Sequence, residues 1–354
     1  GLMIIVVLGG AMDEKWIAYI ASLGQRALLQ EALLLPKPGL VDPISCGAHR
    51  DMDIFTFIDS CEALEAAFAD FVRIGADHVS AEPRAVQRLL RERGILAEQE
   101  MFQATRGINT HKGILYSMAF CLCAVGRVLQ REFGTFFEGA VAPSGTWENR
   151  LQDCREFLSA VRKSEGKNAE QLIADLPNKL FNKCEPILRS EGGSSGDPEL
   201  IRRVIDEVRI LSAGLLAQDM EKARKKQCMT AGERFYFEYG LGGVRGEVEK
   251  GFPTARIAYE LLKDRGSMEQ EHLLRALMRI MSKNDDTNVI ARGGMGSLSE
   301  VKRRSAEILQ LDKDAMFVAL GDMDVRCIEQ NISPGGSADL LSVAIFLYLI
   351  NHGG

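Results

Sequence analysis

The sequence predicts an all-α protein, built as a multi-helix single large domain, on three observations. Apolar residues recur at three- and four-residue spacing along most of the chain from Met12 onward, which is the period of helices that bury one face. Outside residues 2–8, no segment alternates apolar and polar residues as a half-buried strand does. A chain of 354 residues is also long enough to bury a large core, in one domain or in two closely joined ones.

The expected helices follow in order from this spacing. One apolar stripe joins Ile17, Ile20, Ala27, Leu28 and Leu35, and a second joins Phe57, Ile58, Cys61, Leu64, Phe68, Phe71 and Val72. Both are interpreted as core faces. Further helices are expected at about Pro83–Arg93, Ile95–Thr105, Thr110–Arg131, Leu151–Lys163, Glu199–Ala217, Thr254–Lys263, Ser267–Ser282, Ser297–Leu309 and Ser337–Asn351.

Composition limits the classes of function. The net charge of −6 argues against nucleic-acid binding as the main role, although it leaves room for a local basic pocket that holds a phosphorylated small molecule. Eight cysteines without a C-x-x-C pair or zinc spacing indicate reduced thiols in a cytoplasm. The longest apolar run, 340–350, is too short to cross a membrane and suits a buried helix. We therefore expect a small-molecule partner, no nucleic acid and no membrane.

The chain divides by composition into a core and two other parts. Residues 1–11 form an N-terminal extension, in which 2–8 could add a strand or precede a true start at Met12. Residues 132–230 are expected to form a peripheral helical segment, because 165–168 and 191–198 are rich in glycine and polar residues. The catalytic all-α core is then expected in residues 12–131 and 231–354.

The stretch from Glu31 to Asp53 is rich in ionisable side chains. Pro36 and Pro38 end the preceding helix, because proline has no amide donor and disfavours helical angles in the residue before it. The loop that follows carries Lys37, Asp42, His49, Asp51 and Asp53. It can be interpreted as an active-site loop or as a solvated loop in which Asp53 caps the next helix, and composition alone gives the two readings similar weight.

A second polar motif, 105–113, stands directly before a long apolar helix. Asn109 or Thr110 can cap that helix, and its free amides together with His111, Lys112 and Gly113 would form an anion site. The alternative is an ordinary helix cap beside an exposed lysine.

A third motif, 240–253, places four glycines within seven residues. Glycine lets the backbone approach a ligand closely, Arg245 offers a planar fork for phosphate, and Glu247 and Glu249 add carboxylates. The spacing matches neither a Walker A loop nor a dinucleotide fingerprint, so a plain loop remains the alternative.

Two further motifs lie near the C-terminal end of the chain. Asp285 and Asp286 are adjacent carboxylates whose repulsion Mg²⁺ would relieve, in the company of Arg292, Gly293 and Gly294; the alternative is an acidic turn in water. The last motif opens the apolar C-terminal helix as an anion cradle or as a simple cap, with Ser333, Gly335 and Gly336.

Taken together, PKPGLVD, GAHRDMD, NTHKG, RGEVEKGFP, DDTN with RGG, and SPGGSADLL occur in an order by which the chain resembles triphosphoribosyl-dephospho-coenzyme A synthases. The resemblance covers about 13–125 and 230–351. It implies an all-α transferase that joins ATP to 3′-dephospho-coenzyme A, releases adenine and keeps the triphosphate on the transferred ribose. The product is the precursor of the prosthetic group of citrate lyase or malonate decarboxylase. Enzymes of that acyl-carrier pathway and a second copy of the chain are further partners compatible with it.

The candidate residues fit that reaction. Cleavage between ribose and adenine develops positive charge on the sugar, which a nearby carboxylate can stabilise; the same group can activate the attacking hydroxyl. The candidate catalytic residues are Asp51, Asp53, Glu247, Glu249 and His49, which the sequence does not rank. Asp285 and Asp286 are the first choice for Mg²⁺. Substrate-binding candidates are Lys37, Asn109, His111, Lys112, Gly113, Arg245, Arg292, Gly293, Gly294, Ser333, Gly335 and Gly336.

Two other classes of function fit the same features. A metal-dependent nucleotide pyrophosphohydrolase would release pyrophosphate and leave the base attached to the ribose. A helical nucleotide sensor would bind ATP without turnover.

Overall fold

The computed structural model describes residues 11–137, 142, 150–163, 180–181, 187 and 196–353. Its helices, in chain order, are α1 (Glu14–Ala32), α2 (Ile54–Ala63), α3 (Glu65–Asp77), α4 (Pro83–Ala104), α5 (Lys112–Phe137), α6 (Arg150–Lys163), α9 (Pro198–Ser212), α10 (Leu215–Arg224), α11 (Ala231–Tyr239), α12 (Gly243–Glu249), α13 (Pro253–Arg265), α14 (Gln270–Met281), α15 (Thr287–Ile308), α16 (Lys313–Glu329) and α17 (Gly335–His352). Within these ranges we find no β-sheet, only an isolated bridge residue at Gly196, so the all-α prediction is confirmed.

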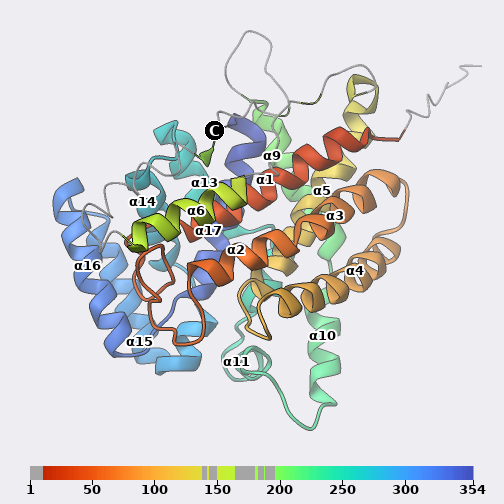
Figure 1. Cartoon of the computed structure of the whole chain (residues 1–354). Coiled ribbons are helices and arrows are strands. Elements are labelled where there is room, and N and C mark those ends of the chain that lie inside the picture. The colour runs from red at the N-terminus through yellow and green to blue at the C-terminus, as the bar shows by residue number, and fades with distance from the viewer. Residues whose placement is uncertain are drawn as a thin grey trace, which may run out of the picture.

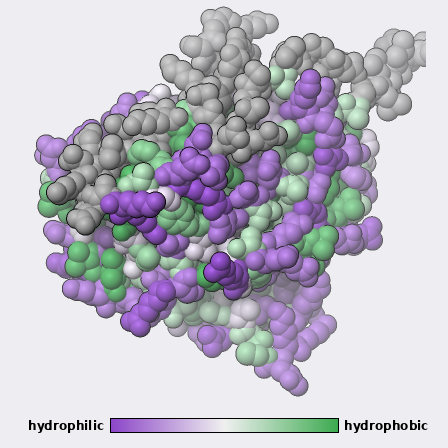
Figure 2. Space-filling view, viewed as in Figure 1, coloured by the Kyte–Doolittle hydropathy of each residue, from purple (hydrophilic) through white to green (hydrophobic). Residues whose placement is uncertain are grey.

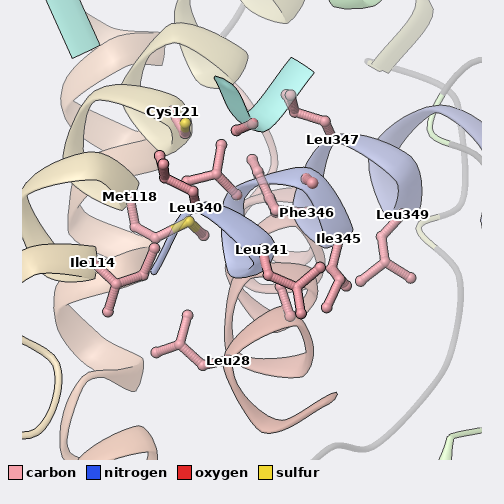
Figure 3. Packing of buried hydrophobic residues seen from close by; sticks show 14 of the residues in the cluster. Leu28, Ile114, Met118, Cys121, Leu340, Leu341, Ile345, Phe346, Leu347 and Leu349 are labelled. Carbon is pink, nitrogen blue, oxygen red and sulfur yellow. The ribbon is translucent and has the colours of Figure 1, made fainter. Parts of the chain in front are cut away.

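The centre of the molecule is α17. Its residues from Leu340 to Asn351 are all buried, as expected for a helix that is apolar on every side. It packs against α1, α5, α13 and α14, and Figure 1 shows it crossing behind α1 in the middle of the molecule. Figure 3 shows Leu340 and Phe346 of α17 in the same cluster as Leu28 of α1 and Met118 of α5.

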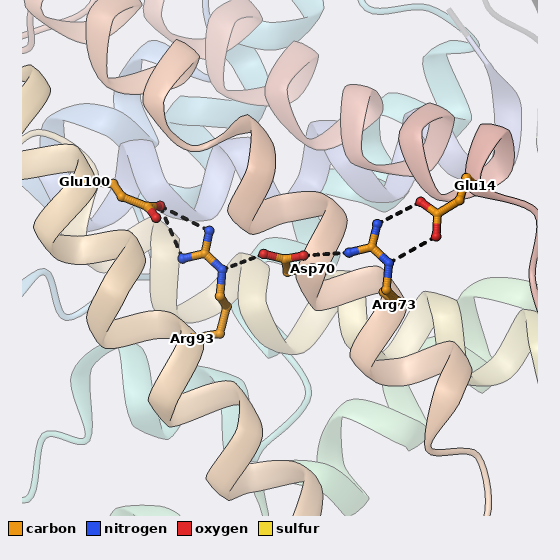
Figure 4. A network of polar contacts seen from close by, with 5 residues as sticks. All are labelled: Glu14, Asp70, Arg73, Arg93 and Glu100. Atoms are coloured by element: carbon orange, nitrogen blue, oxygen red, sulfur yellow. Dashed lines mark hydrogen bonds and ion pairs between the residues drawn. The ribbon is translucent and has the colours of Figure 1, made fainter.

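Two glycines allow α3 and α5 to pack closely. A Cβ atom on Gly75 would lie 2.0 Å from the carbonyl oxygen of Cys123, and one on Gly126 would lie 2.2 Å from that of Val72. Both distances are far below van der Waals contact, so any larger residue would push the two helices apart. A chain of ion pairs then joins α1, α3 and α4 on the outside: Arg73 binds Glu14 and Asp70, and Arg93 binds Asp70 and Glu100 (Figure 4).

Several expected helix boundaries are wrong. The region of two expected helices at 83–105 is one continuous α4, because Gly94 lies inside the helix without interrupting it. The Phe57–Val72 stripe is divided between α2 and α3 at Leu64. The helix expected at 199–217 ends at Ser212, and four helices were not expected, namely α10, α11, α12 and α16. Helix α15 begins ten residues before Ser297, with a kink at Gly294 where φ is 74°.

The expected division of the chain remains a prediction. Residues 1–10, including the segment suggested as a strand, lie outside the described residues, as does much of 132–230. Within the described part of that segment, α9 buries Leu200, Val204, Val208 and Leu211 in the main core, against α5. Helix α10 lies at the lower edge of the view in Figure 1.

The surface and the long helices agree with a protein that keeps its apolar residues inside. The face seen in Figure 2 is mainly hydrophilic, with hydrophobic residues scattered in small groups. One helix among those described, α5 over Lys112–Gly134, is long and apolar enough to cross a membrane, but 83% of it is buried inside the protein. Burial of that kind is typical of a core helix. The seven cysteines of the described part are all free, five of them buried.

Candidate functional site

The five polar motifs meet at one pocket, although they come from opposite ends of the chain. Its cavity has a volume of about 530 Å³, within the range of small-molecule sites. The loops that line it lead directly into helices: 109–113 into α5, 284–288 into α15 and 333–336 into α17. The N-terminal ends of three long helices therefore border the cavity, and the positive ends of their dipoles favour an anion there.

Fourteen of the nineteen candidate residues line this central pocket. They are Lys37, His49, Asp51, Asn109, His111, Lys112, Gly113, Glu247, Asp285, Asp286, Arg292, Ser333, Gly335 and Gly336. The placement brings these side chains together but does not test the role of any of them.

The other five candidates lie elsewhere. Asp53 is the N-cap of α2, accepting from the amides of Phe55 and Thr56, as in the structural reading of that loop, and it also pairs with Arg162. Glu249 accepts from two backbone amides at the start of α10, Gly214 and Leu216.

Arg245 faces a neighbouring pocket, where it pairs with Asp219 at 2.9 Å. Gly293 and Gly294 lie within α15: a Cβ on Gly293 would be 2.4 Å from the side chain of Ile332, and Gly294 provides the kink. These two glycines shape α15 rather than line the cavity.

His49, Arg292 and Ser333 form a connected group at the pocket. Arg292 donates to Nδ1 of His49 at 3.3 Å, and Nε2 of His49 lies 2.8 Å from the Ser333 hydroxyl. Since an arginine can only donate, Nδ1 is the acceptor, and in the neutral ring Nε2 carries the proton and donates to Ser333. Burial and the positive charge of Arg292 lower the pKa of His49, so the ring is neutral at pH 7.

A buried ion pair lies deeper in the pocket. Lys37 Nζ is 2.6 Å from the Glu31 carboxylate and 2.7 Å from its backbone carbonyl oxygen, and both side chains are almost fully buried. This pairing joins the end of α1 to the loop that follows. Glu31 lines the pocket although the sequence analysis did not include it among the candidate residues.

The two adjacent aspartates behave differently. Asp286 is buried and accepts from the amides of Asn288 and Val289, while its other oxygen accepts from the amide and hydroxyl of Ser337. Asp285 is exposed and forms an ion pair with Lys302. Asp286 therefore has a structural role at the start of two helices. The prediction of a metal-binding pair at Asp285 and Asp286 did not include this role.

A further carboxylate, Asp339, faces the same cavity and was also absent from the candidate residues. It has no hydrogen-bonding partner among the described residues. Burial and the negative charges of Glu31 and Asp286 raise the pKa of Asp339 well above its usual range. Its carboxylate lies against Gly113, since a Cβ there would be 2.2 Å from Asp339 Oδ2. Glycine at 113 thus makes room for it.

Glu247 and His111 both line the pocket. Glu247 accepts from the amide and hydroxyl of Thr254, and burial raises its pKa. His111 is buried, with Nδ1 2.6 Å from the Ser60 hydroxyl, and burial and the charge of Lys37 lower its pKa to about 3. Its Nε2 atom is buried and has no hydrogen-bonding partner within the described part of the chain.

The sequence carries no strong signal for Glu31 and Asp339. Glu31 lies in the last turn of a helix whose other residues are mostly core residues, and Asp339 directly precedes the apolar run 340–350. A pattern within one segment cannot identify either, because their role comes from the approach of α17 to α1 in space. A carboxylate near the start of an otherwise largely apolar helix was the one available sign.

The expected Mg²⁺ site remains a prediction. No group of three or more His, Cys, Asp or Glu side chains in the described ranges is arranged to hold a metal ion by itself. Mg²⁺ commonly binds one or two carboxylates and takes its other ligands from water and phosphate. The repulsion among Glu31, Asp286 and Asp339 is of the kind that such an ion relieves.

The fold and the pocket together define an all-α protein with one central pocket bordered by helix N-termini, cations and carboxylates. Comparison with known proteins narrows this class. A sequence model of the ATP:dephospho-CoA triphosphoribosyl transferase family matches residues 17–186 and 188–354, and the chain belongs to that family.

A curated relative supports the same conclusion. The chain is 32% identical over 332 residues to the 2-(5′′-triphosphoribosyl)-3′-dephosphocoenzyme-A synthase of Haemophilus ducreyi, an alignment that covers 92% of this chain and 87% of the relative. No solved structure matches the chain.

Proposed function

We propose that the protein transfers the triphosphoribosyl group of ATP to the 2′-hydroxyl of 3′-dephospho-coenzyme A and releases adenine, in the central pocket. Membership of the transferase family and the name of the relative support this activity. The observation that carries it is the convergence of all five polar motifs on one cavity of about 530 Å³. Motifs that are far apart in sequence have little other reason to meet there.

Charge supports Mg²⁺ as a partner of the donor nucleotide. Six carboxylates line the pocket (Glu31, Asp51, Glu247, Asp285, Asp286 and Asp339) against three cationic side chains (Lys37, Lys112 and Arg292). Such a lining repels a bare triphosphate, so a divalent cation must accompany it. Asp286 and Asp339 would hold the ion, with Asp285 at the rim, and the ion would neutralise phosphate charge and orient the triphosphate.

The protein's own residues supply the rest of the anion site. Gly335 and Gly336 open α17 at the pocket; Asp286 accepts from the amide of Ser337, which leaves the amides of these two glycines to phosphate oxygens. Arg292 lies beside them and is held in place by His49 and Asn331. This arrangement suits a planar, charge-assisted contact with a phosphate.

In the reaction, the bond between ribose C1′ and adenine N9 breaks while the acceptor's 2′-oxygen bonds to C1′. The bonding electrons leave with adenine, and the hydroxyl proton passes to a base and finally to the departing adenine, so atoms and charge balance. Glu247 is the candidate base that best suits this step, because burial raises its pKa and Thr254 fixes its position. Its charge also stabilises the positive charge that develops on the sugar.

The cellular setting follows from the same proposal. The product would be the precursor of the prosthetic group of citrate lyase or malonate decarboxylase, made in the cytoplasm. Acyl-carrier pathway enzymes are its expected partners, and assembly as a homo-oligomer is compatible with it.

Product analysis tests the function directly. Reactions containing ATP and Mg²⁺ with 3′-dephospho-coenzyme A, with coenzyme A, or with no acceptor are separated by mass spectrometry. Transfer predicts adenine only when dephospho-coenzyme A is present, in a product that contains both nucleotides and all three ATP phosphates. Adenine released equally in all three reactions would indicate a nucleosidase. Pyrophosphate in place of adenine would indicate a pyrophosphohydrolase, and no product would indicate a sensor.

A further inference from the structure

A second pocket adjoins the central one. Its cavity of about 420 Å³ lies among α4, α5, α10 and α12. The two cavities share three lining residues, Lys112 and Gly113 at the start of α5 and Val244 of α12. They therefore meet at one place, and Asp339 lies against Gly113 at that place.

Helix α12 separates the two cavities by presenting a different charge to each. Arg245 lines the second pocket, Glu247 lines the central pocket, and Val244 lines both. A base on the central side and a cation on the other are thus held within one helical turn. This arrangement also accounts for the position of Arg245, which is absent from the central pocket.

The second pocket is positively charged, whereas the central pocket is negatively charged. Its lining holds five cationic side chains (Arg91, Lys112, Lys222, Lys226 and Arg245) and three carboxylates (Glu98, Asp219 and Glu233). Arg91 and Arg245 share the single carboxylate of Asp219, at 2.7 and 2.9 Å. Lys222 has no ion-pair partner in the described part of the chain. The excess of cations suits a diphosphate.

The same pocket also offers apolar and aromatic surface. Tyr116 and Phe120 of α5 lie with ring centroids 5.2 Å apart, and the Arg245 guanidinium lies 5.6 Å from the centroid of the Tyr116 ring. Ile95 of α4 lines the cavity while 54% exposed. A ligand with a diphosphate beside a long, partly apolar arm matches this combination of surfaces.

We propose that this second pocket binds 3′-dephospho-coenzyme A, with its diphosphate beside Arg91 and Arg245 and its pantetheine arm along Ile95 and Phe120. The inference rests on the proposed transfer reaction, which needs two nucleotides whose reacting atoms meet. The acceptor's 2′-hydroxyl enters the central pocket at Gly113 and Val244, on the side of Glu247. The donor ATP occupies the central pocket alone.

Filling the second pocket tests this assignment. Gly94 lines it from the middle of α4, and a Cβ there would meet no atom within 4 Å, so Gly94→Trp adds bulk to the cavity without a clash at the backbone. Gly321→Trp is the matched control, because Gly321 is also helical, is equally free of neighbours and lines neither cavity. Initial rates of adenine release give the KM for each substrate, and melting curves confirm that both variants fold.

The expected result is a rise of at least tenfold in the KM for dephospho-coenzyme A in Gly94→Trp, with the KM for ATP within twofold of wild type and Gly321→Trp unchanged. Arg245→Gln, which removes a cation from the second pocket without filling it, should also raise the KM for dephospho-coenzyme A. Wild-type constants in both variants, or a rise confined to ATP, would overturn the assignment while leaving the transfer reaction intact. A wild-type enzyme that releases no adenine with dephospho-coenzyme A would overturn the proposed function and this inference together.

Discussion

Asp286 joins the starts of two helices, since its Oδ2 atom accepts from both the backbone N–H and the hydroxyl of Ser337, each at 2.8 Å. Its other oxygen caps α15 through the amides of Asn288 and Val289. One buried carboxylate thus fixes the relative position of α15 and α17, the two helices that border the phosphate side of the central pocket.

Asp286→Ala should therefore lower the free energy of unfolding by about 2–4 kcal/mol, the sum of a lost cap and of buried donors left unpaired. Asp285→Ala, at the exposed neighbouring position, should change it by no more than about 0.5 kcal/mol. Urea denaturation of both variants measures the difference. Equal stability of the two would show that Asp286 is not the link between these helices.

Glu247→Gln should lower kcat by about 10²–10⁴-fold, because the variant retains the size of the side chain but cannot accept the hydroxyl proton. The KM for ATP should change little. Burial raises the pKa of Glu247, so the wild-type rate should fall as the pH is lowered through that raised value, and this acid limb should disappear in the variant.

Glu249→Gln provides the control for that experiment. Glu249 lies two residues after Glu247, but its carboxylate accepts from backbone amides at the start of α10 instead of lining the pocket. Its kcat should stay near that of the wild type. A normal rate in Glu247→Gln would assign proton transfer to another group, with Asp51 next in order.

Arg292→Gln should weaken ATP binding by roughly 1.5–3 kcal/mol, the free energy of a charge-assisted hydrogen bond to phosphate. Calorimetric titration with ATP and Mg²⁺ measures the change. Arg303→Gln on the same helix is the control, since Arg303 is exposed and pairs only with Glu300 and Glu307. Similar affinities in the two variants would remove Arg292 from the phosphate site.

The contribution of His111 to folding stability should fall as the pH is lowered below about 6.5, because the pKa of His111 is about 3 in the folded state against 6.5 for the free group. The unfolded chain binds a proton that the folded protein excludes. Each pH unit between these values therefore costs up to about 1.4 kcal/mol. The stability is fully present above the unfolded value and is lost progressively on acidification.

Denaturant unfolding at several pH values tests this dependence. His111→Gln should remove its share of the slope. His49 and His352, whose pKa values are also lowered by burial, add to the slope in the same range, whereas Asp42, whose pKa burial raises to about 6, opposes it. An identical slope in wild type and His111→Gln would contradict a buried neutral ring.

The fold class could be predicted from sequence because the apolar spacing persists over most of the chain, and α17 was recognisable from an apolar run of eleven positions. Helix ends were harder to place. Gly94 suggested a break in α4, but its neighbours on both sides continue the same helix, and tertiary packing outweighs the small propensity cost of one glycine.

The residues that form the site could be predicted from sequence for a related reason. Each of the five polar motifs found in the sequence contributes residues to the lining of the central pocket. The role of each residue within those segments could not be predicted. Asp51 and Asp53 are equivalent in sequence, yet Asp53 caps a helix and Asp51 lines the cavity. Glu31 and Asp339 become neighbours of the site only when α1 and α17 pack together.

The central position of α17 also affects how the protein is made. Loops before α5 reach the ribosome exit long before Ser333 and Gly335 do, so a nascent chain carries half of the pocket without the helix that closes it. Helices α1, α3 and α5 can pack on one another early, but the faces of α1 and α5 that contact α17 stay uncovered until α17 is synthesised. If ATP binds in the central pocket as proposed, a ribosome that stalls before residue 335 leaves a chain without the α17 side of that site.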